Sequence, residues 1–320
     1  MTRVAAVDCG TNSIRLLISE IQEDGKIRDI SRTMEIVRLG QGVDATGEFE
    51  PEALARTRAA LEGYVKQMKF EKVERVRMVA TSATRDAKNH REFFDMTEEL
   101  LGQVQPGARA EVISGEEEAL LSFTGAVGDL HSEEGPYCVI DLGGGSTEFV
   151  VGTIDGEILG SHSAQMGCVR LTERIMRNDP PTEAEIEIAT DYVAERMAEV
   201  EKIVPIDKAL TFVGCAGTFT TLSALAQGME RYDADSIHGS ELRFDALRVL
   251  TRQMIGLPSD VRALNPVIHP GRADVIGGGC VAVEGIMTMI ERNSEARSFF
   301  ISEKDILDGI ITGLAAKLAG

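Results

Sequence analysis

Two stretches of the chain, VDCGTNSIRLLI at residues 7–18 and IDLGGGSTEFVV at residues 140–151, match each other. The matching positions are Asp8 with Asp141, Gly10 with Gly143 and Ser13 with Ser146. Apolar residues fall in register on both sides, and each copy runs on through an acidic-Gly turn into a further apolar run. This pattern is typical of strand, tight turn, strand, turn, strand. The repeat therefore predicts two domains of the same kind, each beginning with three antiparallel strands.

The rest of the chain alternates between helix-like and strand-like patterns. The predicted helices cover 51–68, 83–101, a helix opening at Ser114, 167–176, 182–201, 216–226, 245–255, 273–292 and a last helix from Asp305. The predicted strands cover 73–80, 110–113, 137–164, 209–213 and 298–301. This order predicts the α/β class. We place the two domains at 1–125 and 126–304, and leave open that the C-terminal helix 305–320 packs back on the first. No flexible linker separates the halves, so we expect them to face each other across a cleft.

Composition narrows the class of protein. The 320 residues include 52 acidic and 33 basic side chains, a net charge of −19, with 43% hydrophobic and 27% charged residues, as in a globular, water-soluble chain. So acidic a chain repels nucleic acid, and we expect none as a partner. No apolar run approaches the roughly 18 residues that span a bilayer, so we expect no membrane segment and a cytoplasmic location. Five scattered cysteines without a CxxC pair predict neither a disulfide framework nor a structural zinc.

The two Gly/Ser turns are the first candidates for binding. Each joins two strands, unlike a P-loop or Rossmann loop, which opens a helix. The second turn holds Gly143, Gly144, Gly145, Ser146 and Thr147, and the first holds Asn12 and Ser13. Backbone amides without side chains in the way form a nest that suits a phosphate. Ordinary hairpin turns use the same residue types, but the repetition of Asp, Gly and Ser at matching places favours phosphate binding.

Carboxylates flank both turns. Asp8 and Asp141 come at the ends of the strands just before them, and Glu148 comes just after the second turn. Carboxylate oxygens beside a phosphate are typical Mg²⁺ ligands. We therefore predict a metal site from these three residues, holding Mg²⁺ or Mn²⁺.

Other charged residues near predicted element ends are weaker candidates. Ser114 as N-cap accounts for Glu117 through a capping box, which leaves Glu118 without a local structural role. Glu118 is then either a solvated helix residue or a base that orients water. Arg15 and Arg85 could bind phosphate oxygens or serve as surface ion-pair partners. A run of glycines at 277–279 in a helical pattern favours close packing over a ligand site.

Four ordered motifs carry a resemblance to a known family. They are DCGTNSIRL at 8–16, ATSATRDAKN at 80–89, ISGEEEA at 113–119 and DLGGGSTE at 141–148, with shorter matches at 166–171 and 272–276. Together they resemble the Ppx/GppA family of exopolyphosphatases and guanosine pentaphosphatases, a branch of the actin-like ATPase superfamily, over essentially the whole chain. The resemblance implies two ribonuclease-H-like domains with the active site in a cleft between them. It also implies Mg²⁺-dependent hydrolytic release of terminal orthophosphate from polyphosphate or from guanosine pentaphosphate.

The resemblance also implies roles for particular residues. Glu118 would be the catalytic glutamate, and Asp141 and Glu148 would hold metal and water. The turns at 143–146 and 12–13 would hold phosphate, and Arg85 would bind substrate. Longer family members carry an additional C-terminal helical region for which this chain has no room, so we expect short polyphosphate chains as substrate and leave a homodimer open.

Three other functions remain open from the sequence. The chain could hydrolyse guanosine pentaphosphate, the alarmone of the stringent response, instead of polyphosphate. It could be an ATP-dependent small-molecule kinase of the same fold, with its nucleotide near residues 214–218. It could also be a non-catalytic sensor that binds polyphosphate or an alarmone.

Overall fold

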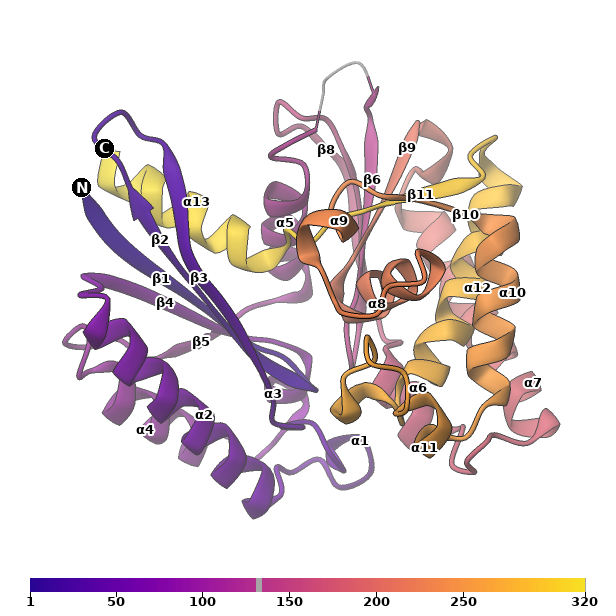
Figure 1. Ribbon diagram of the computed structural model, residues 1–320, viewed down its shortest axis with the longest axis horizontal. Coiled ribbons are helices and arrows are strands. Elements are labelled where there is room, and N and C mark those ends of the chain that lie inside the picture. The colour runs from indigo at the N-terminus through magenta and orange to yellow at the C-terminus, as the bar shows by residue number, and fades with distance from the viewer. Residues whose placement is uncertain (131–133, 320) are drawn as a thin grey trace. The chain divides into compact units, whose positions relative to one another are not determined.

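The computed structural model describes residues 1–130 and 134–319 and contains two β-sheets flanked by helices (Figure 1). The chain divides into two compact units. The first is Met1–Gly125 together with the C-terminal segment from Ile306, and the second is Ala126–Asp305. The α/β class predicted from the order of helices and strands is confirmed.

The first unit is built on a five-stranded sheet of order β3-β2-β1-β4-β5. Strands β1, β2 and β3 are antiparallel neighbours, and β4 and β5 continue the sheet parallel to β1. The strands are β1 (Thr2–Cys9), β2 (Ser13–Ile21), β3 (Ile27–Ile36), β4 (Arg75–Ala80) and β5 (Ala110–Val112). The predicted three-stranded opening of the domain is thus present.

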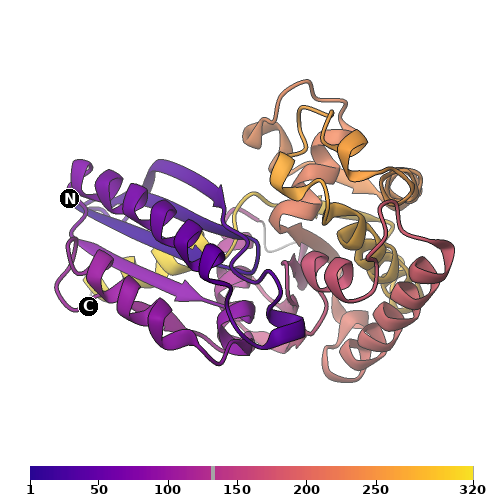
Figure 2. The same ribbon diagram turned by 90° about the horizontal axis from the view of Figure 1, so that it is seen from below.

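Helices cover both faces of this sheet (Figures 1 and 2). Because side chains alternate along a strand, Ala5 and Val7 of β1 enter the core beneath α2 and α4, while Val4 and Ala6 enter the core beneath α13. Burial on both faces explains why β1 is almost continuously apolar. The helices are α1 (Val43–Thr46), α2 (Pro51–Phe70), α3 (Ser82–Asp86), α4 (His90–Leu101), α5 (Gly115–Ala126) and α13 (Ile306–Ala319).

The second unit repeats this topology in a six-stranded sheet of order β10-β11-β9-β6-β7-β8. Here β6, β7 and β8 form the antiparallel meander, and β9 and β11 continue it parallel to β6, as β4 and β5 do in the first unit. The strands are β6 (Tyr137–Leu142), β7 (Thr147–Gly152), β8 (Ile158–Ala164), β9 (Thr211–Cys215), β10 (Glu241–Arg243) and β11 (Ser298–Ile301). The sequence repeat is therefore a repeat of topology.

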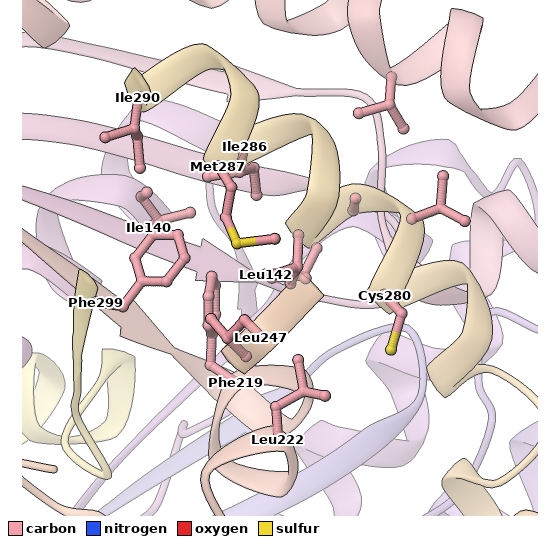
Figure 3. Close-up of a cluster of buried hydrophobic side chains, with 14 of the residues drawn as sticks. Ile140, Leu142, Phe219, Leu222, Leu247, Cys280, Ile286, Met287, Ile290 and Phe299 are labelled. Carbon is pink, nitrogen blue, oxygen red and sulfur yellow. The ribbon is translucent and has the colours of Figure 1, made fainter. Parts of the chain in front are cut away.

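Helix α12 is the centre of the second unit's core. It packs against α6, α7 and α10, and its apolar residues meet β6, α8 and β11 in one buried cluster that includes Ile140, Phe219, Met287 and Phe299 (Figure 3). The helices are α6 (Cys168–Arg174), α7 (Glu183–Ile203), η2 (Ile206–Lys208), α8 (Ala216–Ala226), α9 (Ala234–Ile237), α10 (Phe244–Gly256), α11 (Ser259–Arg262), η3 (Pro270–Arg272) and α12 (Ile276–Asn293). In the described part of the chain, no helix is long and apolar enough to cross a bilayer.

The structure contains several short helices and one short strand that the sequence analysis did not predict. Helices α1, α9 and α11 have four residues each and β10 has three, and the sequence predicted none of them. Such segments contain too little of a helical or strand period to be recognised. The predicted strand 209–213 also lies two residues further on, at Thr211–Cys215.

All five cysteines are buried free thiols, and this leads to a first prediction. Burial raises the pKa of Cys9, Cys138 and Cys280, and raises the pKa of Cys168 to about 11. Because only the thiolate reacts, the native protein should react with iodoacetamide at pH 8 at least about a hundredfold more slowly than the urea-unfolded chain. Mass spectrometry of timed samples measures this. Rapid labelling of any one thiol in the folded protein would contradict it.

Candidate active site

One edge of the first sheet gathers the polar residues that the sequence singled out in the first domain. Strands β1, β4 and β5 are parallel, and the amides that follow β4 and β5 donate to the carbonyls that end β1 and β4, at 3.3 and 3.2 Å. The segments beyond these carboxyl ends are the turn 10–12, α3 and α5. In α/β proteins this is where binding groups collect. The topology therefore places Asp8, Arg85 and Glu118 at one edge of the sheet.

Glu118 is held there by an arginine. Its Oε2 accepts a hydrogen bond from Nη1 of Arg85 at 2.8 Å, and the same nitrogen donates to the carbonyl of Ile113 at 2.9 Å. Glu118 is 9% exposed, so it is not the solvated helix residue that the sequence left open. A carboxylate fixed in this way has a defined orientation, as a base that positions water requires.

The start of α5 explains why Glu118 has this place. The amide of Glu117 donates to Oγ of Ser114 at 3.1 Å, which confirms the predicted N-cap. The carboxylate of Glu117 bonds Arg77 at 2.6 Å. The first turn of the helix is therefore satisfied without Glu118.

Three buried polar atoms of this region have no hydrogen-bond partner among the described residues. They are Oγ1 of Thr11, Oγ1 of Thr84 and Nη2 of Arg85. Thr84 and Arg85 are neighbours in α3, and the side chains of Thr11 and Ala83 both lie beside Gly40. Buried donors without acceptors call for an explanation, and a bound polar ligand is one. Of these three, the sequence indicated only Arg85.

Asp8 is paired within its own hairpin. It lies opposite Arg15 in the β1–β2 register, and its Oδ2 accepts from Nη2 and Nε of Arg15 at 2.7 and 3.1 Å. The sequence predicted Asp8 as a metal ligand and Arg15 as a phosphate ligand. The structure joins the two to each other by an ion pair, and their roles toward metal and phosphate stay predictions.

The first Gly/Ser turn keeps its carbonyls occupied and leaves amides available. The carbonyls of Thr11 and Asn12 accept hydrogen bonds from the segment 37–40, and the amide of Gly10 closes the turn on the carbonyl of Ser13 at 3.0 Å. Within the part of the chain that the structure describes, the amides of Thr11 and Asn12 donate no hydrogen bond. Amides without acceptors are what an anion nest requires, and phosphate binding at this turn stays a prediction.

The second Gly/Ser turn repeats this arrangement. The amide of Gly143 donates to the carbonyl of Ser146 at 3.1 Å, as Gly10 does to Ser13. The carbonyls of Gly143 and Gly144 accept from the first amides of α6, and the carbonyl of Gly145 accepts from Nε of Arg170 at 2.7 Å. Among residues 1–130 and 134–319, nothing accepts from the amides of Gly144, Gly145 and Ser146. Three amide donors are thus available for an anion.

Thr147 lies differently from its prediction as a phosphate ligand. Its side chain is fully buried, and its hydroxyl donates to the carbonyl of Met166 at 2.6 Å. This bond fastens β7 to the segment before α6. The side chain of Thr147 therefore helps to hold the turn in place through this bond.

Asp141 and Glu148 face each other across the second hairpin. They are paired in the β6–β7 register, at the ladder position that Asp8 and Arg15 hold in the first unit. Glu148 is 2% exposed, and its Oε1 accepts from the hydroxyl of Ser163 at 2.7 Å. Two carboxylates at adjacent positions form an oxygen donor set that suits a hard cation. The sequence missed Ser163 because only the β7–β8 register brings it to Glu148.

The three carboxylates of the predicted metal site belong to two different units. No group of three or more metal-ligating side chains occurs among the described residues, and Asp8 belongs to a different unit from Asp141 and Glu148. Mg²⁺ is commonly bound through only one or two carboxylates, with waters and substrate phosphates completing its shell. The pair Asp141 and Glu148 fits such a site.

Two glycine-rich stretches that the sequence noted are closely packed. The turn between β9 and α8 has Ala216 at φ 70°, and Gly217 leaves no room for a side chain because the guanidinium of Arg272 lies against it. In α12, a methyl group at Gly278 would lie 2.7 Å from the carbonyl of Cys168, and one at Gly279 would lie 2.6 Å from the hydroxyl of Thr218. Close packing therefore explains why these two positions have no side chain, and it leaves the backbone amide of Gly278 unaffected.

Two domains of one topology, each opening with a hairpin whose turn offers amides to an anion, define an actin-like ATPase fold. The sequence profile described as the Ppx/GppA phosphatase family matches residues 17–316, and the chain belongs to this family.

Individual members of the family are similar to this chain over nearly its full length. The chain is 52% identical to exopolyphosphatase 2 of Mycobacterium tuberculosis over 318 residues, 98% of this chain and 99% of the relative. A crystal structure of an exopolyphosphatase-like protein is similar with a TM-score of 0.93 and 38% identity, covering 99% of this chain and all of the other. The Aquifex aeolicus member of the Ppx/GppA family has a TM-score of 0.80 and 32% identity, covering 100% of this chain and 99% of that one.

Proposed function

We propose that this chain is an exopolyphosphatase that hydrolyses the terminal phosphoanhydride bond of inorganic polyphosphate and releases orthophosphate. The observation that carries the proposal is the 52% identity to exopolyphosphatase 2 of Mycobacterium tuberculosis over nearly all of both chains. The geometry within each unit supports the same chemistry, because the two units supply backbone amides without acceptors among the described residues, a fixed carboxylate and a pair of carboxylates that suits a metal ion.

The two turns bind phosphate oxygens in this proposal. Each offers backbone amides whose neighbouring carbonyls are already bonded within its own unit. Donors held in this way do not have to reorganise as charge spreads over the oxygens of the transferring phosphoryl group. Hydrolysis then needs little covalent work from the protein.

Glu118 orients the attacking water and accepts its proton. Nη1 of Arg85 fixes the carboxylate, while the buried Nη2 of Arg85 is available to a substrate oxygen. A single guanidinium would then connect the base to the substrate. This extends the predicted role of Arg85, because it positions Glu118 as well as binding substrate.

Asp141 and Glu148 hold the metal ion in this proposal. Bound Mg²⁺ would neutralise charge on the phosphoanhydride oxygens. The hydroxyl of Ser163 keeps the carboxylate of Glu148 oriented on its strand. Such help matters in this chain, since its net charge of −19 repels a polyanionic substrate.

The test is orthophosphate release by the purified full chain from short-chain polyphosphate with Mg²⁺. We expect turnover that stops on addition of EDTA and returns with excess Mg²⁺ or Mn²⁺. Guanosine pentaphosphate, and ATP with and without candidate acceptors, are assayed in parallel.

The pattern of activity decides between the functions. Release from guanosine pentaphosphate alone would replace polyphosphate with the alarmone as substrate. ATP consumption only with an added acceptor would indicate a kinase. Thermal stabilisation by polyphosphate without any release would indicate a sensor.

A further inference from the structure

Helix α12 begins beside a pocket that the proposed active site does not use. The pocket has a volume of about 150 Å³ and lies within the second unit, where Thr172, Arg177, Arg262, Gly277 and Gly278 contribute to its lining. A cavity of about this volume holds a group of about six heavy atoms, as the binding of benzene to an engineered cavity illustrates. The pocket therefore suits a small ligand.

The first turn of α12 presents unused amide donors to this pocket. Nothing in residues 1–130 or 134–319 accepts a hydrogen bond from the amides of Ile276, Gly277 or Gly278. The first backbone bond of the helix runs from Gly279 to Val275 at 3.3 Å. Because α12 has 18 residues, its dipole adds partial positive charge at this end. Two of the three donors are glycines, so no side chains shield them.

A buried guanidinium is aimed at the same place. Arg262 is only 3% exposed, and its Nε and Nη1 donate to the carbonyls of Leu257 and Ala273 at 2.9 and 2.7 Å. Within the described ranges, its Nη2 has no hydrogen-bond partner. A methyl group at Gly277 would lie 3.0 Å from this nitrogen, so Nη2 faces the first turn of α12. Burial lowers the pKa of Arg262, because the charged form has lost water, yet arginine stays protonated at neutral pH.

Two carboxylates and a second arginine also contribute to the lining of the pocket. Both carboxylate oxygens of Asp179 accept from the amide of Ser259, at 2.9 and 3.1 Å. Asp274 precedes the helix and does not bond its first three amides. Arg177 adds a second positive charge, and among the described residues Nε is its one side-chain nitrogen with an acceptor, the carbonyl of Glu173 at 3.1 Å.

We infer that this pocket is an oxyanion-binding site, sized for orthophosphate, in which the first amides of α12 and Nη2 of Arg262 receive the oxygens. The site is distinct from the Gly143–Ser146 turn, although α6 connects them. The amide of Cys168 at the start of α6 donates to the carbonyl of Gly143, and Thr172 later in α6 lines the pocket. The inference does not depend on the proposed function.

The test is an NMR titration that records the amide signals of the two pocket glycines. The full chain is labelled with ¹⁵N-glycine, and the signals of Gly277 and Gly278 are recorded during titration with orthophosphate, against sodium chloride of matched ionic strength. We expect saturable shifts of both signals with orthophosphate only. Arg177→Gln removes one charge at an exposed position and should weaken binding about tenfold, the value of one charge-assisted hydrogen bond.

Two glycine-to-alanine substitutions, one in the pocket and one away from it, give a variant and its matched control. Gly277→Ala places a methyl group 3.0 Å from Nη2 of Arg262 and should also weaken binding about tenfold, read on Gly278. Gly256→Ala meets nothing within 4 Å and should bind as the wild type does. Shifts that chloride reproduces, or unchanged affinity in both pocket variants, would overturn the inference. Shifts at Gly144 and Gly145 without shifts at Gly277 and Gly278 would overturn it too, while leaving the proposed function intact.

Discussion

Replacing Glu118 with glutamine is expected to lower kcat for orthophosphate release by about a thousandfold or more, within the range that a positioned general base contributes. The amide oxygen of glutamine can still accept the hydrogen bond from Nη1 of Arg85, so the side chain should keep its place. It cannot take a proton from water. The expected result is therefore loss of turnover in a folded protein that still binds polyphosphate.

The neighbouring glutamate provides the control for this experiment. Glu116 lies two residues earlier in the first turn of α5 and is exposed, so Glu116→Gln should leave kcat and thermal stability unchanged. Steady-state phosphate release and thermal melting are measured for both variants. If Glu118→Gln keeps more than about a tenth of wild-type kcat, well above what loss of a general base allows, Glu118 is not the base.

Local patterns in the sequence were enough to find the two hairpins, but they left Glu118 open between a solvated helix residue and a base, and only the family resemblance assigned it a role. In a tight hairpin, residues a few positions apart in the sequence lie opposite each other on the two strands. The spacing of seven residues from Asp8 to Arg15, and from Asp141 to Glu148, therefore already contains both cross-strand pairs. The N-cap at Ser114, which is also a local pattern, accounted for Glu117 and so distinguished it from Glu118. For these residues, sequence spacing determines spatial position.

Contacts between distant segments were beyond the sequence. The bond from Arg85 to Glu118 joins residues 33 apart, and the bond from Ser163 to Glu148 depends on the register of a third strand. Nothing in the residues around Arg262 distinguishes a buried arginine from an exposed one. These two hydrogen bonds and the burial of Arg262 depend on how helices and strands pack together, which local sequence patterns do not specify.

The close approach of α6 to the second turn leads to the other large expected effect. Gly167 has an extended backbone, φ −155° and ψ 167°, that any residue could adopt. Its reason to be glycine is space, because a methyl group there would lie 2.3 Å from the carbonyl oxygen of Gly144 and 2.6 Å from the amide nitrogen of Gly145. Both neighbours are backbone atoms, so the turn itself has to move.

Gly167→Ala should therefore lower kcat by about a hundredfold, the cost of misplacing binding groups by about 1 Å. The displaced amides are those of Gly144 and Gly145, which we propose bind the phosphoryl oxygens. Phosphate release is measured beside thermal melting. Gly256→Ala in the same unit, with nothing within 4 Å, shows the cost of an added methyl group alone.

The comparison of the two readouts makes this prediction specific to the turn. A destabilised but otherwise normal active site would lose activity only near its melting temperature. A displaced turn loses kcat far below that temperature, because the amides of Gly144 and Gly145 no longer match the oxygens they are proposed to bind. If Gly167→Ala retains kcat within about threefold of the wild type at a temperature where it is fully folded, far less than a shift of about 1 Å should cost, these amides are not part of the catalytic machinery. Gly40 lies beside the first turn, where an added methyl group would lie 2.3 Å from the side-chain methyl of Thr11. A flexible side chain yields more easily than backbone, so Gly40→Ala should lower kcat less than Gly167→Ala does.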